Sequence, residues 1–377
     1  MKIAFTGYYG FSNYGDDLFA VVCSWAASKY WPDHRASVIG PPVKGADAHF
    51  RVPPFLPKSW YSSTGLAGKL SRLSATACAV LANDVIVLAG GSTLASLGSN
   101  NMHRVQQLAA KWGVTRLAGI GLSLGPFHSC ADEQSCEEFL KRFAYLALRD
   151  RGSYDLAVSM DLPYKPIQAR DLAGMLPLVA EIEPARPGQP RPLGVALCNY
   201  ESYVGGDMEI ERRRNDMLFE AVRDFAGKRN MPVRVFSLNS NQTTGDDVLC
   251  GRLAGFLTEA GVENEVVRTS GGVMDIWQKI GQCSALMSVR LHGGISAYLA
   301  GVPFCLIEYH KKCGDFLDDV GQHSSLRLGG EVSSAGEVAA VLERLTENAP
   351  HPTLDCGSYV EESKLNFTAA PWAERPL

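Results

Sequence analysis

The stretch MSVRLHGGISAYLAG, residues 287–301, passes from an apolar run typical of a buried strand into a small-residue pattern typical of a helix. Arg290 and His292 stand where the strand would end, and the pair Gly293 and Gly294 follows at once. Open α/β sheets bind ligands at the carboxyl ends of their strands, where helix starts offer N–H groups and glycines let a ligand approach closely. The stretch therefore predicts an anion site with a titratable imidazole. The alternative is a plain strand-to-helix corner whose arginine pairs with a carboxylate.

Length and composition limit what kind of protein this is. A chain of 377 residues is long enough for two domains, and 46% hydrophobic with 20% charged residues is a globular composition. With a net charge of −4, the chain lacks the excess of basic residues that is typical of nucleic-acid-binding proteins. The cysteines form no Cys-x-x-Cys pair and the histidines show no metal-ligand spacing. No apolar run would cross a bilayer, and the amino terminus lacks the apolar region of a signal peptide. We expect a cytoplasmic protein without a transmembrane segment, bound metal or nucleic acid.

The sequence GYYGFSNYGDD, residues 7–17, follows the apolar run of a first strand and leads into a helix. Its spacing matches neither the dinucleotide fingerprint nor the P-loop. The carboxylates of Asp16 and Asp17 at the helix start would repel a phosphate, but they can accept hydrogen bonds from hydroxyl groups. We interpret Asn13, Gly15 and the two aspartates as a hydroxyl-binding surface suited to a sugar. A plain helix-capping turn is the alternative.

Strand-like runs alternate with helical patterns along both halves of the chain. This alternation predicts parallel, doubly wound sheets. The run at 84–93 ends in Gly91 and Ser92, so small residues again stand at the carboxyl end of a strand. Several such strand ends in one half favour a common binding surface over unrelated turns.

A proline-rich segment at 183–192 is the predicted domain linker. It separates an amino-terminal Rossmann-like domain, residues 1–182, from a carboxyl-terminal one, residues 193–377. The last helical pattern, SAGEVAAVLERLTENA, can pack back on the amino-terminal domain, and a polar end follows it.

Five blocks of sequence carry a family resemblance: GYYGFSNYGDD, LAGGSTL, LRDRGSYDL, ARDLAGMLP and SVRLHGGISAYLAGVPFCLIEYHKKCGDFLDDVG. In this order they resemble the blocks of the polysaccharide pyruvyl transferase family over most of the chain. Asp17 replaces the family's glutamate, and Ser92 replaces a glycine. The last block is the most specific, and it matches the family pattern at Arg290, His292, Gly301, Val302, Pro303, Tyr309 and Lys312.

The resemblance implies a GT-B-like architecture, in which two Rossmann-like domains face a central cleft. It also implies transfer of pyruvate from phosphoenolpyruvate to two hydroxyls of one sugar in a cell-surface or exopolysaccharide precursor, which forms a cyclic ketal. Phosphoenolpyruvate is then a co-substrate, and no cofactor is expected. The acceptor is a saccharide, free or lipid-linked, and a lipid-linked acceptor is compatible with peripheral membrane association.

Residue roles follow from the same resemblance, because the carboxyl-terminal domain of GT-B enzymes generally holds the donor. The expected donor-binding residues are Arg290, His292, Gly293, Gly294, Lys312 and Tyr309. The expected acceptor-binding residues are Asn13, Gly15, Asp16, Asp17, Gly91 and Ser92. A positioned imidazole can act as acid and then as base. We therefore expect His292 to be catalytic, together with Arg290 and Asp16.

One departure from the family pattern concerns the donor. The family often has an arginine after the first strand of the second domain, where this chain has Cys198. Either Arg212, Arg213 or Arg214 from the next helix substitutes for it, or the donor is a different anion. Two alternatives stay open. A nucleotide-sugar glycosyltransferase would need a ribose ligand such as Glu308, and a non-catalytic carbohydrate-binding relative would have lost turnover.

Overall fold

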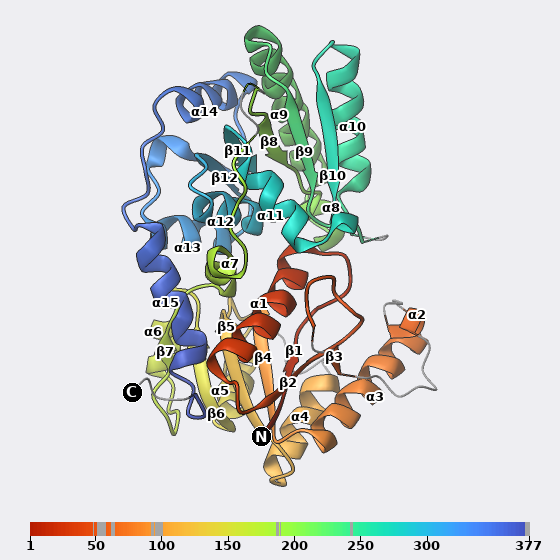
Figure 1. Cartoon of the computed structure of the whole chain (residues 1–377), viewed down its shortest axis with the longest axis vertical. Coiled ribbons are helices and arrows are strands. Elements are labelled where there is room, and N and C mark those ends of the chain that lie inside the picture. The colour runs from red at the N-terminus through yellow and green to blue at the C-terminus, as the bar shows by residue number, and fades with distance from the viewer. Residues whose placement is uncertain are drawn as a thin grey trace. The chain divides into compact units, whose positions relative to one another are not determined.

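The computed structural model describes residues 1–47, 49–50, 58–61, 65–91, 94, 101–185, 188, 190–241 and 244–373. They fold into two compact units, each built on a parallel sheet with flanking helices (Figure 1). The first unit comprises Met1–Phe11, Asp16–Met175 and Gly357–Leu377. The second comprises Ser12–Gly15 and Leu176–Cys356. Two doubly wound parallel sheets are the predicted fold class.

The sheet of the first unit has seven parallel strands in the order β3-β2-β1-β4-β5-β6-β7. These strands are β1 (Lys2–Thr6), β2 (Arg35–Ile39), β3 (His49–Phe50), β4 (Val85–Gly91), β5 (Arg116–Leu122), β6 (Phe143–Leu148) and β7 (Ile167–Gln168). The helices are α1 (Tyr14–Tyr30, whose first two residues belong to the second unit), α2 (Lys58–Tyr61), α3 (Leu66–Ala82), α4 (Asn101–Lys111), α5 (Cys130–Leu140), α6 (Arg151–Ser159) and α15 (Cys356–Thr368). Strand β4 is buried along almost its whole length, as expected for a central parallel strand.

The sheet of the second unit has six parallel strands in the order β10-β9-β8-β11-β12-β13. These strands are β8 (Leu193–Ala196), β9 (Val233–Ser237), β10 (Asn264–Arg268), β11 (Ala285–Ser288), β12 (Phe304–Glu308) and β13 (Arg327–Gly329). The helices are α7 (Leu176–Val179), α8 (Tyr200–Val204), α9 (Met208–Arg229), α10 (Asp247–Glu259), α11 (Val273–Gly281), α12 (Leu291–Leu299), α13 (Lys311–Val320) and α14 (Ala335–Glu347). The strand order reverses between β8 and β11, so the carboxyl edge there is a topological switch point. No helix in the described ranges is both long and apolar enough to cross a membrane.

The two units divide between Met175 and Leu176, ahead of the segment that composition predicted as a linker. Residues just before that segment pack on α11, where the Trp277 indole N–H donates to the Ala180 carbonyl at 2.9 Å. This contact places the chain after α7 in the second unit. Within 183–192, residues 186, 187 and 189 lie outside the described residues.

The tail of the chain differs from the expectation. The last predicted helix is α14, which belongs to the second unit, and the supposed polar end forms α15, which belongs to the first. There the Asn366 side chain accepts from the Gly121 N–H at 2.8 Å, and the Trp31 indole donates to the Phe367 carbonyl at 2.9 Å. A polar end was expected here because the composition of this segment is polar. Its few buried residues, such as Tyr359 and Phe367, nevertheless recur at helical spacing, so that one side of α15 is buried.

Candidate active site

Arg290 follows the end of β11, as the sequence predicted, and occupies the position directly before α12. Its Nε and Nη2 atoms donate to the two oxygens of Asp246 at 2.9 and 2.7 Å. Asp246 is fully buried, and Arg290 is 12% exposed at its side chain. Burial raises the pKa of Asp246, and the adjacent guanidinium opposes that rise. The Nε–Nη2 edge, which a bidentate grip on a donor anion would use, is therefore engaged by a carboxylate.

Asp246 also links the ends of three neighbouring strands. Its carboxylate interacts with the backbone N–H of Asn199 after β8, and its own N–H donates to the Asn239 carbonyl after β9 at 2.6 Å. Arg290 supplies the third link, after β11. Sequence reasoning missed Asp246 because its partner is 44 residues away in the chain. The available signal was the acidic pair Asp246 and Asp247 at the start of the helix predicted after β9.

His292 lies in the first turn of α12, half-buried and in contact with the amino-terminal loop. A Cβ atom built on Gly15 would lie only 2.1 Å from His292 Nδ1. Both residues belong to the second unit, which includes the short segment Ser12–Gly15. The absence of a side chain at position 15 therefore makes room for the imidazole ring.

The segment Ser12–Gly15 is held on the second sheet by its backbone. The Tyr14 N–H donates to the Leu238 carbonyl at 2.8 Å, and the Ser240 N–H donates to the Ser12 carbonyl at 2.8 Å. The buried Tyr14 hydroxyl also bonds the Ser296 hydroxyl on α12 at 2.8 Å. Two of the residues expected on the acceptor side, Asn13 and Gly15, thus lie in the unit that carries Arg290 and His292.

The glycine pair of α12 has a different role from the one expected. A Cβ on Gly293 would lie 2.4 Å from Ser288 Oγ, and one on Gly294 would lie 3.3 Å from the Leu306 side chain. Both glycines are buried, and they allow α12 to pack closely on β11 and β12. The space above their Cα atoms is filled by protein, so it does not admit a ligand.

Asp16 and Asp17 lie in the first unit, where Asp17 Oδ1 accepts the Gly10 N–H at 2.7 Å. Burial raises the pKa of Asp17 to about 6, although this hydrogen bond lowers it. Gly91, also in this unit, has a positive φ of 86° at the end of β4. Ser92 lies outside the described residues.

Tyr309 and Lys312 follow β12 on the same carboxyl edge as α12. The Lys312 ammonium lies over the Tyr309 ring, 5.8 Å from its centroid. His310, which sequence reasoning missed, caps α13 by accepting the Lys312 N–H at 3.2 Å. The Tyr200 ring packs edge-on against Tyr309, with centroids 4.7 Å apart. A histidine one residue before a helical pattern was the signal for the cap.

Cys198 is buried, and Arg214 is the arginine of α9 that reaches it. The Arg214 Nη2 atom lies 3.5 Å from the Cys198 carbonyl oxygen. Both Nη atoms of this buried guanidinium also donate to Glu201, each at 2.7 Å. Arg214 thus brings positive charge beside Cys198, but a carboxylate balances it. The exposed Arg212 instead pairs with acidic residues of its own helix.

Glu308, the ribose ligand of the glycosyltransferase alternative, is also engaged. Its two oxygens accept from Arg327 at 2.8 and 2.7 Å. The carboxylate therefore stabilises the β12–β13 edge of the sheet.

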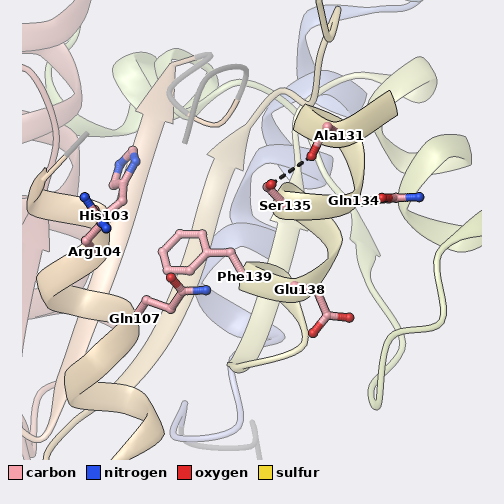
Figure 2. A pocket seen from close by; sticks show the side chains of 8 residues that line it. All are labelled: His103, Arg104, Gln107, Ala131, Gln134, Ser135, Glu138 and Phe139. Carbon is pink, nitrogen blue, oxygen red and sulfur yellow. Dashed lines mark hydrogen bonds between the residues drawn. The ribbon is translucent and has the colours of Figure 1, made fainter. Parts of the chain in front are cut away.

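A pocket of about 550 Å³ lies in the first unit between α4 and α5 (Figure 2). Gln107 and Phe139 extend toward each other across it, and burial lowers the pKa of His103 on its wall to about 4. None of the predicted site residues lines this pocket. The predicted active site therefore does not coincide with this pocket.

Comparisons with known proteins give a family and a fold. A family model described as polysaccharide pyruvyl transferase matches residues 13–311. A search of curated protein sequences found no match.

Among solved structures, the UDP-GlcNAc 2-epimerase from Methanocaldococcus jannaschii aligns with a TM-score of 0.60. The UDP-GlcNAc 2-epimerase from Neisseria meningitidis, bound to UDP-GlcNAc, aligns with a TM-score of 0.59. They are 12% and 11% identical, and each alignment covers 96% of this chain and 98% of the other. HepE from Anabaena, in complex with UDP and glucose, aligns with a TM-score of 0.55 and 13% identity over 98% of this chain and 95% of its own. At such identities the likeness shows a shared GT-B-like fold.

Proposed function

Because the chain belongs to the polysaccharide pyruvyl transferase family, we propose that it transfers pyruvate from phosphoenolpyruvate to two hydroxyls of one saccharide. The observation that supports this most directly is the placement of Arg290 and His292. Both lie at the switch point of a doubly wound sheet, on the helix start where such folds bind anions. We place the donor site there, and the acceptor is a sugar of a cell-surface or exopolysaccharide precursor.

The donor carries a phosphate and a carboxylate, and the carboxyl edge of the second sheet supplies positive charge for both. The helices α12 and α13 begin side by side at this edge, because β11 and β12 are neighbours, and each directs the positive end of its dipole there. Lys312 adds a full charge in the first turn of α13. We assign the donor anion to this set, with Arg290 held in place by Asp246.

The proposed reaction needs proton transfer at carbon and at oxygen. A proton is added to the methylene carbon of the donor, and one acceptor oxygen bonds to C2. The second acceptor oxygen then displaces phosphate from C2. The two hydroxyl protons end on the new methyl group and on the released phosphate. His292 can carry both transfers, first as acid and then as base, a contribution of about 10²–10⁴-fold.

The acceptor hydroxyls also need an oxygen that accepts their protons or orients them. We propose that Asp16 does this, with Asp17 beside it at the start of α1. A base is most effective when its pKa lies near the working pH, and burial has moved the pKa of Asp17 to about 6. Asp17 is therefore the second candidate for this role.

The experiment supplies phosphoenolpyruvate with a panel of saccharides and follows phosphate release together with a new ketal methyl signal by NMR. Both are expected only when a suitable saccharide is present. His292→Ala should lose turnover, whereas His351→Ala, at an exposed position of the same unit, should retain it. Release of nucleoside diphosphate from sugar nucleotides, with no ketal formed, would contradict the proposal.

A further inference from the structure

Three helices of the first unit, α2, α3 and α4, expose large apolar side chains to solvent. Helix α3 packs against both α2 and α4, and the three lie together in orange in Figure 1. The exposed side chains, with their exposed fractions, are Trp60 (48%), Leu66 (73%), Leu70 (54%), Leu108 (47%) and Trp112 (72%). Exposed apolar side chains gathered on adjacent helices indicate a binding surface, whereas scattered ones need no explanation. We name this surface the α2–α4 face.

Helix α4 shows how the face is built. Arg104, Leu108 and Lys111 of α4, and Trp112 directly after its last residue, follow one another at spacings that place them on one side of a helix, and all four are exposed. Helix α3 has the same mixture, with the exposed Lys69 between Leu66 and Leu70. Each helix therefore presents apolar and basic side chains together on its outer side.

The face lies in a strongly basic part of an acidic chain. Residues 48–131 contain seven Lys and Arg side chains but one acidic residue, Asp84, which gives a formal charge of +6. The whole chain carries −4, so the remaining residues carry −10. The described helices α3 and α4 contain no Asp or Glu, whereas the next helix, α5, contains four. The part of the chain that forms α2, α3 and α4 is thus net positive, whereas the remaining residues are net negative.

We infer that the α2–α4 face binds the surface of an anionic lipid bilayer. Helices that lie in a membrane interface combine Trp and Leu with Lys and Arg in this way, because the apolar side chains enter the headgroup region while the cations attract anionic lipids. A second copy of the chain would bring like charges together. A nucleic acid would use the charges but leave the leucines and tryptophans in water. This inference does not depend on the proposed pyruvyl transfer.

The test measures co-sedimentation of the full chain with phosphatidylcholine vesicles, with and without phosphatidylglycerol. Binding is expected only to the anionic vesicles and should weaken as salt is added. Leu70→Glu and Trp112→Glu should each lower the partition coefficient at least ten-fold. Lys111→Glu should lower it by roughly five-fold for each unit of charge changed. Circular dichroism and a melting curve check that each variant is folded.

Matched controls lie on other helices of the same unit. Val158 on α6 is 55% exposed, close to the 54% of Leu70 on α3, and Lys29 on α1 is exposed, as Lys111 is on α4. Val158→Glu and Lys29→Glu should bind anionic vesicles like the wild type. Equal binding to both vesicle types, or equal losses in the control variants, would overturn the inference. So would self-association that Trp112→Glu abolishes, observed without any vesicle binding. Loss of pyruvyl transfer in solution has no bearing on this measurement.

Discussion

Replacing Gly15 with alanine should disturb His292 without changing any charged or polar group. The added Cβ would lie 2.1 Å from Nδ1 and 2.7 Å from Cε1 of the imidazole. An ordinary contact between such atoms is about 3.4 Å or more, so the ring or the loop must move by more than 1 Å. Overpacking of this kind costs about 1–3 kcal/mol. A displacement of about 1 Å at a reacting group can lower turnover by roughly 10²-fold.

The assay compares kcat for phosphate release in the wild type and in Gly15→Ala, together with the NMR signals of the His292 ring. Gly255→Ala is the matched control, because Gly255, like Gly15, is a helical glycine that belongs to the second unit, and a Cβ there meets open space. The control should retain full turnover and unfold no more easily, since alanine favours helix more than glycine does. Wild-type turnover and unchanged ring signals in Gly15→Ala would refute the argument that this loop positions His292.

Two further predictions concern buried carboxylates. Asp246→Asn breaks the pair with Arg290 and should lower the free energy of unfolding, measured by chemical denaturation, by about 3–5 kcal/mol. The control is Asp224→Asn, which breaks an exposed pair. A loss of unfolding free energy no larger than that of the control would contradict the burial argument. In the folded protein the pKa of Asp17 is about 6, above its ordinary value of 3.8, so the folded state binds this proton more tightly than the unfolded state does. The free energy of unfolding therefore falls as the pH rises from about 4 to above 6. Asp17→Asn should therefore melt at a higher temperature than the wild type at pH 7 and lose this advantage at pH 4; a constant difference between the two pH values would count against the assignment.

Local sequence was sufficient to predict the two parallel sheets and the strand end that carries Arg290 and His292. A buried parallel strand and the helix that follows it are encoded within about twenty residues, as in the stretch 287–301. The partner of Arg290 could not be predicted in this way. The corner alternative required some carboxylate, but only the folded sheet shows that it is Asp246, at the start of the helix after β9.

The amino-terminal loop shows the same limit more clearly. Its glycines and Asn13 suggested a turn with an exposed surface. The loop does contain a turn, in which Asn13 Oδ1 accepts the Gly15 N–H at 3.2 Å. The contact of Gly15 with His292 joins residues 277 positions apart, and no local pattern encodes it. A glycine that makes room for a distant ring has the same sequence signature as a glycine that permits a turn.

Two arginines of the second unit, the buried Arg214 and the partly buried Arg290, bear on which groups could hold a donor anion. Arg290 uses its Nε–Nη2 edge on Asp246, and Arg214 uses both Nη atoms on Glu201. A guanidinium held by a carboxylate in this way is fixed in place, but much of its charge is balanced. The net attraction for a doubly anionic donor then has to come from other groups on the same carboxyl edge. We propose that the starts of α12 and α13 and the ammonium of Lys312 provide it. On this reasoning Lys312→Met should raise the KM for phosphoenolpyruvate more than it lowers kcat, whereas Lys311→Met, one position earlier on α13 and paired with Asp315, should change neither.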